Sequence, residues 1–336
     1  MRFLPKNMLV TGGAGFIGSH FVHYYQKNYP EVFIVNLDKL TYAGGLKKLV
    51  GLLYSNKHTF IQGDIRDKQL IYQLLREFCI NTVVHFAAET HVDRSIEDPD
   101  SFVQTNVLGT LSLLEESRKY CSEKNWTNKD FRFHHVSTDE VYGTLKKNEQ
   151  PFTEMTAYAP TSPYSSSKAA SDHLVNAYYR TYGLATTMSH CSNNYGLFQH
   201  DEKFIPTIIR HCLAQQSIPV YGDGSNIRDW LHVEDHCSGI DSIIRAGKIG
   251  ETYNIGGNTE LSNLEVIACI CSTLNQVSSD RYEYDKLVSF KKDRLGHDWR
   301  YAIDTGKISR ELNWKPRESF VSGIRKTLEA YLTKIV

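Results

Sequence analysis

The sequence has no excess of either charge, no long apolar run and no paired cysteine motif. Its 38 lysines and arginines balance 38 aspartates and glutamates, so the formal net charge of the 336 residues is zero. Bulk charge therefore does not favour binding to nucleic acid or to a membrane surface, although a local basic pocket for a phosphorylated small molecule stays compatible. No segment is long and apolar enough to predict a signal peptide or a membrane span. We expect no nucleic-acid partner and no membrane partner.

Cysteine is scarce and scattered. The seven cysteines are Cys79, Cys121, Cys191, Cys212, Cys237, Cys269 and Cys271. None of them shows the CxxC spacing of a zinc site, and their number is odd. We therefore expect reduced, mostly structural thiols and no bound metal, as in a protein of the cytoplasm.

What the sequence does contain is a regular alternation of short apolar segments and helical patterns. Strands are predicted at 8–11, 32–37, 59–62, 82–86, 131–136 and 185–190. Between them, apolar residues recur at helical spacing, as in 17–25 and 103–114. This alternation predicts an α/β fold with a Rossmann-type, doubly wound parallel sheet that has helices on both faces. Ligands of such sheets lie at the carboxyl ends of the strands.

The pattern loosens after about residue 190, where segments rich in glycine, asparagine and aspartate appear. We predict a dinucleotide-binding domain over residues 1–190, which residues 229–257 rejoin through the strand-like Tyr253-Asn254-Ile255. Residues 191–228 and 258–336 are predicted to form a smaller, partly interleaved substrate domain. A chain of this length is large enough for one big domain or two smaller ones.

A glycine-rich turn follows the first predicted strand and opens the first predicted helix. Gly12, Gly15 and Gly18 are spaced by three residues within the segment 11–18. The first permits a tight turn, the second lets the backbone approach a pyrophosphate, and the third allows close packing of helix and strand. A lone glycine run also fits an ordinary turn, but here the strand and the helix lie on the correct sides.

Asp38 ends the next predicted strand, about twenty residues further on, where dinucleotide-binding folds place an acidic residue. Its carboxylate can accept hydrogen bonds from the ribose hydroxyls and would repel a 2′-phosphate, so we predict NAD rather than NADP, although Lys39 next to it weakens the repulsion slightly. Further contacts are expected after the third and fourth strands, at Gly63-Asp64-Ile65 and Phe86-Ala87-Ala88-Glu89. Each of these two segments, taken alone, also fits simple packing.

Two groups of residues suggest chemistry. Tyr164 and Lys168 lie four residues apart, so on a helix they share one face. A lysine ammonium and a positively charged nicotinamide would lower the pKa of the phenol and make it a base. Thr138-Asp139-Glu140 ends a strand and adds two carboxyl groups, which suit an enzyme that also moves a proton and expels water. A surface Tyr–Lys pair and a polar cap of the next turn are the plainer interpretations.

These motifs together resemble the dTDP-glucose 4,6-dehydratase family of the extended short-chain dehydrogenases/reductases, from residue 8 to about residue 330. The segments that carry the resemblance are 12–18, 38–44, 135–143, 164–168, 192–196, 227–230 and 296–298. The resemblance implies a lyase that keeps NAD as a bound prosthetic group and converts dTDP-glucose to a 4-keto-6-deoxy sugar and water.

The same resemblance implies a role for each catalytic residue. Tyr164, with Lys168 and NAD, would oxidise C4 of the glucose, and Thr138 would hydrogen-bond the C4 oxygen. Glu140 would remove the C5 hydrogen while protonated Asp139 gives a proton to the leaving C6 hydroxyl. The stored hydride would then return to C6 and a proton to C5.

The resemblance also implies two sets of binding residues. NAD would contact Gly12, Gly15, Phe16, Ile17, Gly18, Asp38, Lys39, Leu40, Thr41, Asp64, Ile65, Phe86, Ala87, Ala88, Glu89, Thr105, Tyr164, Lys168 and Asn194. The nucleotide sugar would contact Thr90, Thr138, Asn193, Lys203, Phe204, Pro219, Val220, Tyr221, Arg228, Asn263, Asp293, Arg294 and His297. Arginine suits the diphosphate because its planar guanidinium binds phosphate through two parallel hydrogen bonds.

Other interpretations stay open at this point. A UDP-glucose 4,6-dehydratase would share Thr-Asp-Glu, whereas a 4-epimerase or a UDP-glucuronate decarboxylase needs no acid for a C6 hydroxyl. A non-enzymatic NAD-binding sensor would have no reason to keep Tyr164, Lys168 and the carboxyl pair. We also expect a homodimer formed through a four-helix bundle, because helical patterns around 103–114 and 165–179 have apolar residues on more than one face.

Overall fold

The structure is a computed structural model that describes residues 2–278, 281–293 and 298–335. In these residues the central element is a seven-stranded parallel sheet with the order β10-β6-β5-β4-β1-β2-β3. Its strands are β1 (Asn7–Thr11), β2 (Phe33–Asp38), β3 (His58–Gln62), β4 (Thr82–His85), β5 (Arg132–Thr138), β6 (Thr186–Cys191) and β10 (Thr252–Ile255). The order changes direction next to β1, as in a Rossmann-type sheet, so the predicted fold class is confirmed.

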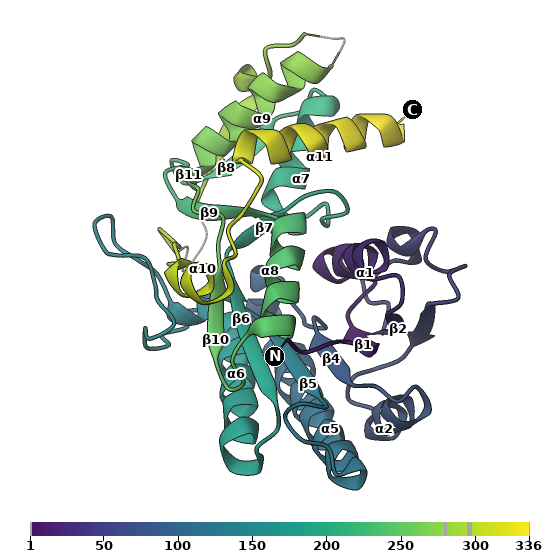
Figure 1. Cartoon of the computed structure of the whole chain (residues 1–336). Helices are drawn as coiled ribbons and strands as arrows, with labels where there is room; N and C mark the ends of the chain where they lie inside the picture. The colour runs from purple at the N-terminus through teal and green to yellow at the C-terminus, as the bar shows by residue number, and fades with distance from the viewer. Residues whose placement is uncertain (1, 279–280, 294–297, 336) are drawn as a thin grey trace.

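Helices cover both faces of this sheet (Figure 1). The helices α1 (Phe16–Asn28) and α8 (Val233–Ala246) pack together on one face. The helices α2 (Lys68–Glu77), α5 (Thr110–Lys124) and α6 (Pro163–Tyr182) pack on the other. Each face has its own apolar core, and β4, β5 and β6 are buried along their whole length although they carry several polar residues.

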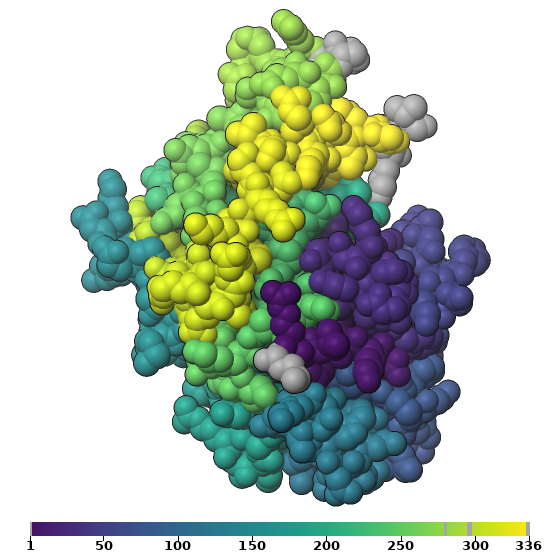
Figure 2. Space-filling model, viewed as in Figure 1, coloured from purple at the N-terminus to yellow at the C-terminus, as the bar shows by residue number. Residues whose placement is uncertain are grey.

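The later parts of the chain build a second group of elements at the carboxyl edge of the sheet. In the described residues it contains one three-stranded sheet, one two-stranded sheet and three larger helices. These elements are β7 (Asn193–Tyr195), β9 (Ile227–His232), β11 (Glu260–Ser262), β8 (Ile218–Tyr221), β12 (Val288–Lys291), α7 (Phe204–Leu213), α9 (Asn263–Val277) and α11 (Phe320–Ile335). In the space-filling view these green and yellow segments form the upper part of the molecule, above the purple and blue N-terminal segments (Figure 2).

Shorter elements connect these layers. They are α3 (Val92–Glu97), α4 (Pro99–Phe102), α10 (Gly306–Leu312) and the 3-10 turns η1 (Leu46–Leu49), η3 (Asp139–Tyr142) and η4 (Tyr284–Leu287). Within the described ranges, no helix is both long and apolar enough to cross a membrane.

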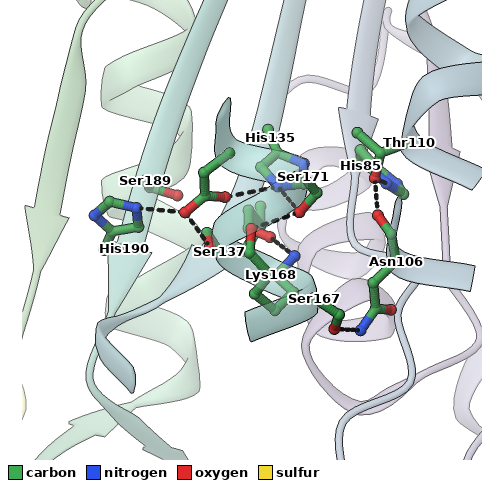
Figure 3. Close-up of polar contacts among 12 residues, drawn as sticks. His85, Asn106, Thr110, His135, Ser137, Ser167, Lys168, Ser171, Ser189 and His190 are labelled. Atoms are coloured by element: carbon green, nitrogen blue, oxygen red, sulfur yellow. Dashed lines mark hydrogen bonds and ion pairs between the residues drawn. The ribbon is translucent and has the colours of Figure 1, made fainter. Parts of the chain in front are cut away.

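The segment before α5 departs from the predicted regular helix. Residues Val103–Gly109 form a π-helical turn, η2, which joins α4 to α5. Asn106 in this turn is buried; its Oδ1 accepts from the backbone N of Glu89 at 2.9 Å and its Nδ2 donates to Ser167 Oγ at 2.8 Å (Figure 3). The π-turn therefore ties the loop after β4 to α6. Such turns occur often at functional sites.

Helix α6 begins at a well-defined signal in the sequence. Ser162 Oγ accepts from the backbone N of Ser165, Ser165 Oγ accepts from the backbone N of Ser162, and Pro163 occupies the first helical position. This reciprocal capping satisfies two donors that a helix start would otherwise leave unpaired. The cap fixes where the helix starts and therefore where Tyr164 and Lys168 lie.

We predict that Ser162→Ala lowers the free energy of unfolding by about 1 kcal/mol, because it removes the N-cap of α6. Chemical denaturation followed by far-ultraviolet circular dichroism measures this loss. The matched control is Ser166→Ala, an exposed position in the same first turn that accepts no capping bond. Equal stability of the two variants would contradict a stabilising role of the cap.

Candidate active site

A cavity lies at the carboxyl ends of the central strands, and most of the predicted site residues line it. The lining includes the predicted cofactor contacts Gly12, Gly15, Phe16, Ile17, Gly18, Asp38, Lys39, Thr41, Asp64, Ile65, Phe86, Ala87, Ala88, Glu89, Thr105 and Asn194. It also includes the predicted catalytic residues Thr138, Asp139, Glu140, Tyr164 and Lys168. Three further predicted substrate contacts, Thr90, Asn193 and Lys203, line the same cavity. The structure thus brings both motif groups of the sequence into one space.

The glycine turn has the geometry that a dinucleotide requires. Gly12 has a φ of +72°, and a Cβ there would lie 2.6 Å from the backbone N of Ala87. A Cβ on Gly18 would lie 2.3 Å from the carbonyl oxygen of Gly12. Helix α1 starts directly after Gly15, with no side-chain cap and no acidic residue in its first turn. Its N-terminal N–H groups therefore fit an anion such as a pyrophosphate.

Asp38 lies at the end of β2 and is held by the backbone. Its Oδ2 accepts from the backbone N of Ala14 at 2.9 Å, and its Oδ1 accepts from the backbone N of Leu40 at 2.8 Å. A carboxylate has about four acceptor sites, so two of them are still available in principle on the cavity side. This fits ribose hydroxyls. The side chain of Leu40 is not part of the lining and packs instead against the apolar core beside α1.

Asp64 follows β3 and lies between two basic side chains. Lys39 Nζ lies 3.0 Å from its Oδ2, and Arg66 Nη2 lies 2.8 Å from the same oxygen. Although partial burial favours the neutral acid, the hydrogen bonds from Arg66 and Lys39 hold the pKa of Asp64 well below its usual range. The carboxylate is therefore ionised where it lines the cavity.

The segment Thr138-Asp139-Glu140 both caps a turn and lines the cavity. Thr138 caps the 3-10 turn η3, because its Oγ1 accepts from the backbone N of Glu140 at 3.3 Å. The plainer interpretation of this segment, a polar cap, is thus correct as far as Thr138 goes. The carboxyl groups of Asp139 and Glu140 nevertheless line the cavity, so the cap also directs two acids toward a ligand.

Asp139 is buried and mostly surrounded by groups that disfavour its charge. Only 2% of the residue is exposed, and among the described residues its Oδ2 has no hydrogen-bond partner. Burial, followed by the neighbouring carboxyl groups of Glu140 and Asp229, raises its pKa well above the usual range. A carboxyl group held neutral in this way can donate a proton, as a general acid must.

Tyr164 and Lys168 share the inner face of α6 and are both buried. Lys168 Nζ donates to the carbonyl oxygen of Val136 at 2.9 Å, and burial lowers its pKa. For Tyr164, the effect of the protein's own groups differs from the expectation. Burial and the carboxyl group of Glu140 raise its pKa well above the usual range, and the opposing hydrogen bond from Thr138 is smaller. Lowering the pKa of Tyr164 therefore requires a positive charge that the protein itself does not supply.

The other predicted substrate residues lie in the C-terminal elements and outside the cavity lining. Phe204 opens α7 and stacks on Trp230, with ring centroids 6.3 Å apart. Arg228 is buried; its guanidinium donates to the carbonyl oxygens of Ile227, Asp298 and Trp299. The remaining members are Pro219, Val220 and Tyr221 in β8, Asn263 at the start of α9, and Asp293. Arg294 and His297 lie outside the residues that the structure describes.

Several lining residues were not predicted from the sequence, among them Lys48, Cys191, Ser192, Gln199, His200 and Glu202. Glu202 is surrounded by basic groups: His91 and His200 each lie 3.5 Å from its Oε2, and Arg94 lies 3.7 Å away. His200 and Glu202 share the loop before α7, whereas His91 and Arg94 lie at the start of α3, so the fold and not a local sequence pattern brings them together. Asp172 was not predicted from the sequence either. It lies four residues after Lys168 and therefore on the same helix face, and this spacing could have indicated it.

Comparison with known proteins identifies the family. Residues 9–327 match the family described as GDP-mannose 4,6 dehydratase. The chain belongs to this dehydratase family. A dTDP-glucose 4,6-dehydratase of Salmonella typhimurium is 51% identical over 334 residues, which cover 97% of this chain and 92% of that protein. A dTDP-glucose 4,6-dehydratase of Xanthomonas campestris is 52% identical over 328 residues, with 97% and 93% covered.

A solved structure supports the same family. The crystal structure of a dTDP-glucose 4,6-dehydratase from Streptomyces venezuelae, with NAD bound, superimposes with a TM-score of 0.89. It is 43% identical and covers 97% of each chain. The predicted resemblance to the dTDP-glucose 4,6-dehydratases is therefore confirmed.

The raised pKa of Asp139 in this dehydratase-family chain predicts a pH-dependent stability difference. Because the folded pKa lies above the unfolded one, ionisation of Asp139 costs stability as the pH rises above about 4. Asp139→Asn removes that cost. Up to the folded pKa, the variant should gain about 1.4 kcal/mol over the wild type for each pH unit. Urea unfolding at several pH values between about 5 and 8 measures the difference. A difference that does not change with pH would show that Asp139 ionises normally.

Proposed function

We propose that this protein is an NAD-dependent dTDP-glucose 4,6-dehydratase, a hydro-lyase that forms dTDP-4-keto-6-deoxyglucose and water. One observation carries the proposal: in one cavity, a buried carboxyl group with a raised pKa, Asp139, adjoins a second carboxyl group, Glu140, opposite Tyr164 and Lys168. An oxidoreductase alone needs only the tyrosine and the lysine. The relatives that are about half identical over nearly the whole chain carry the name of this activity. The product is an intermediate of deoxysugars such as rhamnose.

The residues at the strand ends fit NAD. The glycine turn and the start of α1 would hold the pyrophosphate, and Asp38 would hold the adenosine ribose. When bound, NAD takes up a hydride from C4 of the sugar and supplies one at C6. The small side chains of Ala87 and Ala88 leave room for a ligand against β4.

The first chemical task of the protein is to remove a proton from the C4 hydroxyl. We assign this step to Tyr164, with Thr138 hydrogen-bonding the C4 oxygen. Lys168 places a buried positive charge on the same helix face, where it favours the phenolate. Adding a positive ligand charge near Tyr164 offsets the influence of Glu140 that raises its pKa. In this proposal Tyr164 becomes an effective base only when the positively charged ligand is bound.

The second task is elimination across C5 and C6. A ketone at C4 acidifies the C5 hydrogen, and we assign its removal to Glu140. Asp139, which burial keeps protonated, gives its proton to the departing C6 hydroxyl. Glu140 afterwards returns a proton to C5. Each of these acid–base steps accounts for about 10²–10⁴ in rate.

The sugar nucleotide would extend from the cavity toward the C-terminal elements. We propose that Thr90 and Asn193 contact the hexose and phosphates, and that Lys203 contacts the nucleotide. Residues of α7, β8 and α9 would frame the nucleotide, with Arg228 and Arg294 at the diphosphate, Asp293 and His297 beside them, and Tyr221 on the base. Tyr221 is 46% exposed on β8, which leaves its ring accessible for stacking.

We further propose the domain division predicted from the sequence, in which residues 229–257 rejoin the domain of residues 1–190. The pairing of β10 with β6 in the main sheet supports this return. The stretches 191–228 and 258–336 form the substrate domain in this proposal.

We also infer a homodimer that pairs α5 and α6 with their copies in a four-helix bundle. Exposed apolar side chains on these helices and the preceding π-turn support it, namely Val103, Leu108 and Tyr182. Multi-angle light scattering at micromolar concentration should give twice the monomer mass of 38.4 kDa. A monomer mass would contradict the dimer.

We further propose that the protein functions in the cytoplasm, since its seven cysteines are free thiols.

The activity is tested by incubating the purified protein, without added NAD, with dTDP-glucose in D₂O and following the sugar by NMR. We expect a 4-keto-6-deoxy sugar with deuterium at C5, because Glu140 exchanges its proton with solvent. A 4-epimer without deuterium at C5 would contradict the roles of Asp139 and Glu140. Repetition with UDP-glucose distinguishes the two nucleotides, and turnover faster than with dTDP-glucose would reassign the substrate.

Two variants test the elimination step. Glu140→Gln and Asp139→Asn should each lower kcat by about 10²–10⁴ while NAD stays bound, because the redox residues are untouched. The NAD content of the purified variants is measured by chromatography after denaturation. Wild-type turnover in either variant would contradict its assigned role.

A further inference from the structure

Behind the redox pair, one carboxylate gathers hydrogen-bond donors from three parts of the chain. Asp172 lies on α6, one turn after Lys168, and is fully buried. Ser137 Oγ donates to its Oδ2 at 2.9 Å, and His190 Nε2 lies 3.0 Å from the same oxygen. His135 Nε2 lies 3.1 Å from its Oδ1. Figure 3 shows His135, Ser137 and His190 converging on the helix that carries Lys168.

A fourth donor comes from the loop before α6. Tyr158 OH donates to Asp172 Oδ2 at 3.2 Å and lies 3.0 Å from His190 Nε2. The other ring nitrogen of His190 lies 2.6 Å from Tyr142 OH, which donates to Asn254 Oδ1 at 3.0 Å. The polar chain therefore extends from α6 through β6 to β10. All of its members are buried or nearly so.

Two of these donors lie close in sequence to residues that line the cavity. Ser137 directly precedes Thr138 at the end of β5, and His190 lies just before the Ser192-Asn193-Asn194 segment that lines the cavity. Asp172 itself is two turns along α6 from Tyr164. One side chain thus connects the helix of the redox base, the strand of the acid–base pair and the strand that leads to the substrate side.

The surroundings of Asp172 favour its ionised form. Burial acts in the opposite direction, but the hydrogen bonds from His135 and His190 hold its pKa well below the usual range. Lys168 supplies a buried positive charge one turn away on the same helix. A buried carboxylate that has several donors and a nearby cation makes a rigid junction, since losing any partner would leave a buried polar group unpaired.

We propose that Asp172 is a positioning residue: it fixes Thr138, Asp139 and Glu140 at the end of β5 relative to Tyr164 and Lys168 on α6. This inference rests on the proposed function. A displacement of about 1 Å between catalytic groups costs on the order of 10²-fold in rate. Asp172 is not among the residues that line the cavity, so its effect should appear in kcat and leave ligand binding nearly unchanged.

The experiment compares Asp172→Asn with the control Asp241→Asn. Asp241 is also a buried carboxylate with tyrosine donors; it accepts from Tyr25 at 2.6 Å and from Tyr29 at 2.8 Å, between α1 and α8 on the opposite face of the sheet. We expect Asp172→Asn to lower kcat by about 10²-fold, with KM for dTDP-glucose and NAD content close to wild type. Asp241→Asn should keep kcat, because Asp241 lies on the opposite face of the sheet from the redox pair.

A second variant, Ser137→Ala, removes one of the two contacts from β5 to Asp172 and keeps the contact from His135, so it tests the inference if Asp172→Asn does not fold. Single-turnover absorbance of the reduced cofactor reports C4 oxidation, and deuterium incorporation at C5 reports elimination. We expect Ser137→Ala to slow deuterium incorporation more than cofactor reduction, because Ser137 adjoins the acid–base segment.

The outcomes separate this inference from the proposed function. If the wild type does not convert dTDP-glucose, the proposed function fails. If the wild type converts it and Asp172→Asn keeps kcat unchanged, as Asp241→Asn should, Asp172 is only structural and the inference is overturned. Equal slowing of both steps in Ser137→Ala would overturn the specific link to β5.

Discussion

The burial of one positive charge, the ammonium of Lys168, is the constraint on which the site depends. A buried ammonium requires a hydrogen-bond acceptor and a nearby negative charge. The carbonyl oxygen of Val136 supplies the first and Asp172 the second. Asp172 in turn requires donors, and the strands β5 and β6 supply them through Ser137 and His190. Satisfying one charge therefore fixes the relative positions of the helix and both strand ends, and these are the elements that line the cavity.

Two aspartates near this charge are held in opposite protonation states, although their intrinsic chemistry is the same. Both are buried, so desolvation raises the pKa of each. Asp172 has several donors and becomes an anion, whereas Asp139 faces the carboxyl groups of Glu140 and Asp229 and stays neutral. The number of donors, and not the depth of burial, decides the outcome. The fold can thus place an anchor and an acid close together using one residue type.

The sequence predicted the parts of the site that are determined by short segments. The glycine turn, Asp38, the Thr138–Glu140 segment and the Tyr164–Lys168 pair all depend on local spacing within one strand–turn–helix unit, and all of them line one cavity. The π-turn at Val103–Gly109 was not predicted, because it is stabilised by contacts of Asn106 with residues 89 and 167, which are distant in sequence. The cluster around Glu202 was missed for the same reason, since its partners His91 and Arg94 are distant from it in sequence.

Tyr164 shows most clearly where spacing stops being sufficient. The spacing of four residues from Lys168 correctly predicted that the two side chains share a helix face. The pKa of Tyr164, in contrast, depends on every charged group around it, and the spacing does not show which groups these are. Burial and the carboxyl group of Glu140 outweigh the opposing hydrogen bond from Thr138, so the pKa of the phenol is raised. In the proposed mechanism Glu140 is the base of the elimination, and its carboxyl group near Tyr164 opposes the first step. The proposed enzyme thus combines two reactions whose charge requirements conflict, and a ligand charge that is present only in the loaded site resolves the conflict.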